Sequence, residues 1–149
     1  MASQFALAII VVDGRYALQL RDDKSGISCP GMWGLFGGKI ERDEKPKSAI
    51  IREVAEELGI KLRRCRFLRT IQRYNDFEGK TVQYWLFTAN ISHEQWERHK
   101  LNEGQDANHF AFDELCDLCM PPLIREVLEC HYRSKWPGSG KTEYLKVVL

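Results

Sequence analysis

The sequence lacks a surplus of charge of either sign. Its 22 lysines and arginines are balanced by 21 aspartates and glutamates, which gives a formal net charge of +1 at pH 7. So small a net charge produces no strong overall attraction to nucleic acid or to an anionic membrane surface. We therefore expect neither of them as a partner.

Long hydrophobic runs and a regular cysteine pattern are also missing. No run approaches the ~20 apolar residues that span a bilayer. The apolar segment 5–12 has no basic segment before it and no small-residue cleavage site after it, so we interpret it as a buried strand and not as a signal peptide. The five cysteines are odd in number and irregularly spaced, which suits a reducing compartment better than a disulfide framework. These features predict a cytoplasmic protein.

The length of 149 residues suits one ordinary domain, which we place at residues 1–133, with 134–149 as a C-terminal tail of unknown role. Strands and helices interleave irregularly, which predicts an α/β (α+β) fold with a mixed β-sheet sandwiched between helices. Hydrophobic periodicity and turn signals predict strands at 5–12, 15–20, 33–36, 66–74, 81–91 and 110–112, and helices at 46–58, 95–100, 113–118 and 123–132.

Three glutamates share one face of the predicted helix 46–58. Glu53, Glu56 and Glu57 stand at spacing i, i+3 and i+4, which places their carboxylates within one turn. Like charges at that distance repel, and each tends to raise the pKa of its neighbours. A hard cation such as Mg²⁺ removes the conflict, because it takes oxygen ligands and bridges to phosphates. For this pattern alone, a solvated acidic helix face is the commoner explanation.

The residues around these three glutamates favour a metal site over a solvated acidic helix face. Gly38 is followed after five residues by Glu44, and after seven more by Arg52, which opens the run REVAEELGI. This spacing resembles the signature of the Nudix hydrolase family, G-x5-E-x7-R-E-U-x-E-E-x-G-U with U aliphatic, at every specified position. Chance would produce such a match on the order of once in 10⁹ start positions. The preceding GMWGLFGG resembles MutT-like members, although Phe36 stands where many of them carry proline.

The resemblance, which covers about residues 5 to 118, implies a Nudix fold and a set of roles. Mg²⁺ is the implied metal, with Mn²⁺ as a substitute. Arg52 and Glu44 are expected to form an ion pair that orients the acidic helix. The implied metal ligands are the side chains of Glu53, Glu56 and Glu57 and the backbone carbonyl of Gly37.

Two further residues are implied less directly. Asn102 to Gln105 resembles a Glu-Gly-Gln segment of related sequences, which makes Glu103 a candidate metal ligand or catalytic base; Glu53 is the other candidate base. Arg21 ends the second predicted strand, where family members place a cation near the substrate phosphates. The alternatives are a solvent-facing loop acid for Glu103 and a surface arginine for Arg21.

The implied reaction is attack of water on phosphorus in a nucleoside diphosphate that carries a further group. The compact size favours (d)NTP pyrophosphohydrolysis, which gives a nucleoside monophosphate and pyrophosphate. Nucleotide sugars and dinucleoside polyphosphates stay open as substrates, and so does a homodimer. A non-catalytic nucleotide sensor is the alternative of another class, but the intact box argues against it.

Three weaker signals have structural explanations that we prefer. The stretch 138–142 (GSGKT) resembles the end of a P-loop but has no preceding strand, so we interpret it as tail. Cys116 and Cys119, with Cys130 and His131 further on, lack the second cysteine pair that a zinc finger needs. A basic stretch after the box could hold a polyphosphate or RNA, although a solvated strand face is favoured: Lys61, Arg63, Arg64, Arg66, Arg69 and Arg73.

Overall fold

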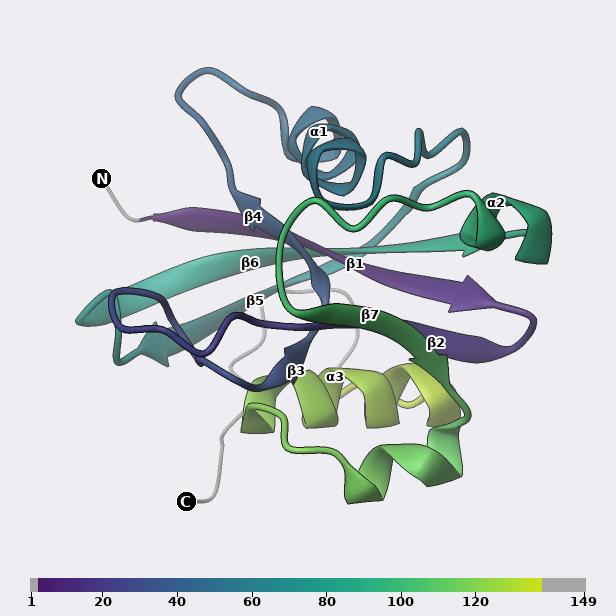
Figure 1. Ribbon diagram of the computed structural model, residues 1–149. Coiled ribbons are helices and arrows are strands. Elements are labelled where there is room, and N and C mark those ends of the chain that lie inside the picture. Colours follow the sequence, from purple (N-terminus) through teal and green to yellow (C-terminus); the bar gives the residue numbers. More distant parts are fainter. Residues whose placement is uncertain (1–2, 138–149) are drawn as a thin grey trace.

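The computed structural model describes residues 3–137. They form three layers, in which helices cover both faces of a β-sheet (Figure 1). This is the mixed sheet between helices that the sequence predicted. The strands are β1 (Gln4–Val12), β2 (Arg15–Leu20), β3 (Trp33–Gly34), β4 (Phe36–Lys39), β5 (Arg66–Asn75), β6 (Lys80–Ile91) and β7 (Asp106–Phe110). The helices are α1 (Pro46–Leu58), α2 (His93–Glu97), the 3₁₀ helix η1 (Phe112–Asp117) and α3 (Pro122–Arg133).

The central strand of the sheet is β1. Along one edge it pairs in parallel with β6 over its whole length, and β5 continues the sheet beyond β6 in antiparallel register. Two strands share the other edge: β4 pairs with residues 5–8 of β1, and β2 pairs with residues 10–12. β3 and β7 both extend the sheet from β2.

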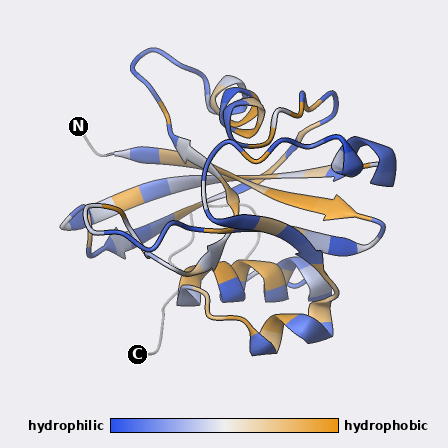
Figure 2. Cartoon of the chain, viewed as in Figure 1, coloured by the Kyte–Doolittle hydropathy of each residue, from blue (hydrophilic) through white to orange (hydrophobic). Residues whose placement is uncertain are grey.

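The two helical layers cover opposite faces of the sheet because the strand residues alternate between them. Ala8 and Ile10 of β1 point toward α1, whose Ile50 and Val54 are fully buried. Ile9 points the other way and packs in the cluster that holds Val127 of α3. Figure 2 shows the apolar side of each helix turned toward the sheet. The two clusters form the core that holds α1 in place over β4.

Helix α1 has the bounds that the sequence predicted, and three other elements differ from their predicted bounds by more than one residue. The predicted strand 33–36 is broken at Leu35, because β3 pairs with β2 and β4 pairs with β1. The helix predicted at 95–100 is α2, which begins earlier because Ser92 and Gln95 form a capping box. The strand predicted at 110–112 lies earlier, at Asp106–Phe110, where it pairs with β2.

Two expectations concern the end of the chain and the membrane. The P-loop-like stretch 138–142 lies outside the described residues, as does the tail beyond residue 137. Within the described range, no helix has the length and apolar character needed to cross a bilayer.

Candidate active site

Glu57 is the most buried acid of the described chain, with 3% of its surface exposed. It lies on the face of α1 that covers β4, and its carboxylate accepts a hydrogen bond of 2.8 Å from the backbone amide of Gly37. Burial is the main cause that raises the pKa of Glu57, to about 8, and the nearby charges of Glu103 and Glu53 add to the rise. An ionised Glu57 therefore needs a positive charge nearby.

Gly37 lets β4 approach β1 closely enough for this contact. Its φ is +144°, and a Cβ built on it would stand 2.1 Å from the carbonyl oxygen of Ala6. No side chain fits in that space. Close approach of β1 therefore requires glycine at this position, apart from any role of its carbonyl as a metal ligand.

The carboxylate of Glu53 lies directly over the next residue of β4. A Cβ on Gly38 would stand 2.5 Å from Cδ of Glu53. Burial raises the pKa of Glu53, while a hydrogen bond of 2.8 Å from Arg52 opposes the rise. The negative charges of Glu56 and Glu103 raise the pKa further. Glu53 thus stands beside Glu57 over the glycine strand, as their shared helix face predicted.

Arg52 binds several of the acids at once. Its Nε and Nη2 donate to the two carboxylate oxygens of Glu44 at 2.7 and 2.9 Å, a bidentate pair. Nη1 lies 2.8 Å from Glu53 and 3.2 Å from Glu56, whose side chain is 57% exposed. The hydrogen bonds from Arg52 lower the pKa of Glu44 to about 2. The predicted contact between Arg52 and Glu44 is present, and it extends to the acidic face of α1.

The loop that carries Glu103 is held against β2 and α1. Gln19 of β2 donates from Nε2 to the carbonyl of Glu103 at 2.8 Å, and the amide of Asn102 donates to the carbonyl of Glu57 at 2.9 Å. Gly104 has φ +87°, and a Cβ there would stand 2.8 Å from the carbonyl oxygen of Leu20. The charge of Glu103 raises the pKa values of Glu53 and Glu57. The fold therefore brings Glu103 to the acidic face of α1.

Arg21 lies on the other side of the same loop. Its Nε donates to the carbonyl of Ser28 at 2.7 Å, and its own carbonyl accepts from Gln105 at 2.8 Å. With Lys24 and Glu103 it lines a small cavity of about 90 Å³. The structure thus places Arg21 close to the acidic cluster.

Sequence reasoning missed Gln19 and Lys24. Gln19 is 2% exposed, and its signal was a polar residue in an otherwise apolar strand. Lys24 gave no signal, because it lies in a loop that looked solvent-exposed; its Nζ stands 3.8 Å from Asp22. Both residues line the same small cavity as Glu103.

The chemistry of these side chains fits a hard divalent cation. Buried Glu57 lies within the field of Glu53 and Glu103, and oxygen donors are what Mg²⁺ prefers. Among residues 3–137, no three His, Cys, Asp or Glu side chains stand close enough together to hold a metal ion. The carboxylates of Glu53 and Glu56 lie 2.8 and 3.2 Å from Nη1 of Arg52. Cys116 and Cys119, considered above for zinc, are exposed free thiols.

An acidic helix set over a glycine-bearing strand within a three-layer sandwich defines the class of protein. The chain belongs to the Nudix family: the sequence model described as the NUDIX domain matches residues 3–129. A human diphosphoinositol polyphosphate phosphohydrolase is 32% identical over 115 residues, which cover 76% of this chain and 62% of that protein. An 8-oxo-dGTP diphosphatase of Proteus vulgaris is 38% identical over 60 residues, 39% of this chain and 52% of that protein. The chain thus spans between half and two thirds of the length of these relatives.

Solved structures agree with the family and the fold. A MutT Nudix hydrolase from Burkholderia pseudomallei superposes with a TM-score of 0.73 at 28% identity, over 87% of this chain and 97% of that one. A MutT protein from Methanosarcina mazei Go1 superposes with a TM-score of 0.76 over 89% and 94% of the two chains. Its 23% identity supports the fold alone.

We predict that the Glu44→Gln variant loses stability in a pH-dependent way. Because the folded protein holds the pKa of Glu44 near 2, against 4.5 for the free group, the carboxylate stabilises the fold fully above pH 4.5. That stabilisation disappears as the pH falls toward 2. Urea unfolding should show the variant less stable by on the order of 1–3 kcal/mol at pH 7, with the gap shrinking below pH 4.5. Glu41→Gln is the matched control, because Glu41 is 69% exposed and 3.8 Å from Arg52. A gap that stays constant from pH 7 to 3 would contradict the pairing.

Proposed function

We propose that this protein is a Mg²⁺-dependent hydrolase of the diphosphate linkage in nucleoside diphosphates that carry a further group. One observation carries the proposal. Glu57 is 3% exposed, lies close to the charges of Glu53 and Glu103, and forms no ion pair within residues 3–137. Such an arrangement lowers stability in the absence of a cation, so it is better explained by metal binding than by structure. Mn²⁺ is the expected substitute metal.

The proposed metal ligands are Glu53, Glu56 and Glu57 with the carbonyl of Gly37, and Glu103 as a further ligand or as the base. A bound divalent cation polarises phosphoryl oxygens and acidifies the attacking water. Arg52 positions Glu53 and Glu56 through Nη1, and Glu44 fixes Arg52 through its two carboxylate oxygens.

Between the two candidate bases, we favour Glu103. The guanidinium of Arg52 stands 2.8 Å from Glu53 and already occupies a carboxylate oxygen of Glu53 with a hydrogen bond. Glu103 has no ion pair among the described residues, so its carboxylate is available to take the proton from water.

For the substrate we favour a (d)NTP, with release of a nucleoside monophosphate and pyrophosphate. Arg21 and Lys24, at the small cavity beside Glu103, are the candidate contacts for its phosphates. The relatives that act on single nucleotides support this: the 8-oxo-dGTP diphosphatase above, and a CTP pyrophosphohydrolase of Escherichia coli K12 that is 39% identical over 44% of this chain. Because the human relative matches over 76% of this chain, diphosphoinositol polyphosphates are the second candidate substrate class.

The proposal is tested by a phosphate-release screen with Mg²⁺ over nucleoside triphosphates, nucleotide sugars, dinucleoside polyphosphates and diphosphoinositol polyphosphates. We expect turnover only with a divalent metal, and a loss of several orders of magnitude in the Glu57→Gln variant, which keeps the side chain's shape but removes its charge. In ¹⁸O-labelled water the label should enter a phosphate product, because the cluster stabilises charge on phosphoryl oxygens. Tight nucleotide binding without turnover across the panel would instead establish a sensor, and label in a sugar hydroxyl would establish attack on carbon.

A second prediction separates the two roles of Glu103. If Glu103 is the base, Glu103→Gln lowers kcat at saturating Mg²⁺ by on the order of 10²–10⁴ and flattens the acid limb of the pH–rate profile. Asp106→Asn is the control, because it removes a charge from the same region at an exposed position. Recovery of the rate of Glu103→Gln at high Mg²⁺ would make Glu103 a ligand and leave Glu53 as the base.

A further inference from the structure

A second cavity lies away from the acidic cluster, at the other end of β1. Its volume is about 710 Å³, in the range of roughly 300–1,000 Å³ typical of small-molecule sites. The carboxylate of Glu53 lies over Gly38, which pairs with Ala6, whereas the cavity begins at Val11, about 17 Å further along the strand. Val11 also packs with the α3 side of the core and not with the α1 side. The cavity is therefore separate from the site over β4.

The lining of this cavity carries positive charge and no carboxylate. Arg64 and Arg66 are exposed at its rim, and neither side chain forms a hydrogen bond or ion pair with any other residue between 3 and 137. Two other cations of the same basic stretch are engaged further along β5. The guanidinium of Arg69 lies 4.6 Å from the ring centroid of Trp136, and Arg73 pairs with Glu126 at 3.0 Å. Uncompensated positive charge thus gathers at the cavity.

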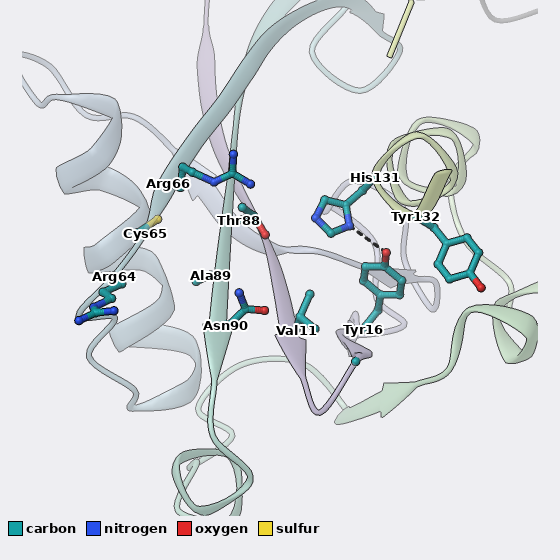
Figure 3. Close-up of a pocket in the computed structure, with 11 residues that line it drawn as sticks. Val11, Tyr16, Arg64, Cys65, Arg66, Thr88, Ala89, Asn90, His131 and Tyr132 are labelled. Carbon is teal, nitrogen blue, oxygen red and sulfur yellow. Dashed lines mark hydrogen bonds between the residues drawn. The ribbon is translucent and has the colours of Figure 1, made fainter. Parts of the chain in front are cut away.

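Buried Tyr16 and half-buried His131 form a polar pair on the side of the cavity opposite the arginines (Figure 3). The hydroxyl of Tyr16 stands 2.8 Å from Nδ1 of His131. Burial raises the pKa of Tyr16 to about 12, so the phenol keeps its proton. Burial and the charge of Arg66 lower the pKa of His131, which favours the neutral ring. The pair then has one O–H and one N–H, of which one donates within the pair and the other is left free to donate in either tautomer. The pair therefore adds another donor to the two guanidinium groups.

We propose that this cavity binds a small phosphate-bearing molecule of about nucleotide size. The planar forks of Arg64 and Arg66 match phosphate oxygens in pairs, and no acidic side chain of the lining opposes an anion. Tyr132, at the rim, is 59% exposed and stacks on Phe112 at 3.8 Å, so its ring offers a rigid flat surface to a base or another ring. This site would be occupied whether or not the catalytic proposal holds.

A single-stranded RNA is less well matched to this surface. RNA binding uses a groove that follows the backbone and several aromatic rings on which successive bases stack. Here the unpaired cations do not continue as a stripe along β5, and Tyr132 is the one exposed ring among the lining residues. The geometry fits a compact anion better than a strand.

The test is an NMR titration of the full chain with AMP, and separately with inorganic phosphate, in EDTA and a phosphate-free buffer at pH 7. We expect saturable shifts of the backbone amides of Arg64, Arg66 and Asn90 with both probes. The double variant Arg64→Gln/Arg66→Gln should weaken AMP binding at least tenfold. Lys61→Gln/Arg63→Gln removes the same charge from exposed positions of the same segment outside the cavity, and should change affinity less than threefold. All four positions are exposed, so both variants should unfold at the wild-type temperature.

Four outcomes would overturn the proposal. The first is shifts confined to Arg21, Glu103 and Gly104, which would assign AMP to the catalytic cleft alone. The second is equal weakening by both double variants, which would show general charge attraction and no site. The third is an oligoadenylate that binds far more tightly than AMP and loses affinity in both double variants, which would show an RNA surface. Absence of any shift up to 10 mM AMP would equally refute it.

Discussion

The hydrogen bond from the amide of Gly37 to the carboxylate of Glu57 joins the glycine strand to the acidic helix. It requires β4 to lie so close to β1 that Gly37 has no room for a side chain. The carboxylate of Glu57 that accepts this bond is 3% exposed, and burial raises its pKa to about 8. A fold selected for stability alone would place an amide or an apolar residue there. The buried carboxylate is the feature from which we infer a metal site and hydrolytic function.

Arg52 compensates the negative charges of several acids on and beside α1. The guanidinium satisfies both oxygens of Glu44 and still reaches Glu53 and Glu56 through Nη1. Glu57 lies beyond its reach, on the side of α1 that faces β4. The bidentate pair with Glu44 thus anchors Arg52 beside the acidic face of α1.

The sequence predicted the features that depend on neighbouring residues, and it did not predict those that depend on pairing between distant segments. Helix α1 was predicted to the residue, because Pro46 and Gly59 mark its ends. The contact of Arg52 with Glu44 followed from the spacing of the family signature, and the place of Glu103 near the acidic helix agrees with the resemblance of residues 102–105 to related sequences. The break at Leu35 could not be predicted, because it depends on which strand each half pairs with. The cavity beside Arg66 combines β1, β6 and α3, so no single segment of sequence could reveal it.

The central claim is that buried Glu57 is compensated by a divalent cation. Urea unfolding of the wild-type protein and of Glu57→Gln, in EDTA and across a Mg²⁺ series at pH 7.5, tests it most directly. In EDTA, the variant should be the more stable protein, because its amide accepts from Gly37 while neutral at every pH, whereas the raised pKa of Glu57 makes the wild type take up a proton on folding at pH 7.5. Saturating Mg²⁺ should stabilise the wild type by on the order of 1–3 kcal/mol and leave the variant nearly unchanged. Equal stabilisation of both proteins by Mg²⁺, or of neither, would contradict the account.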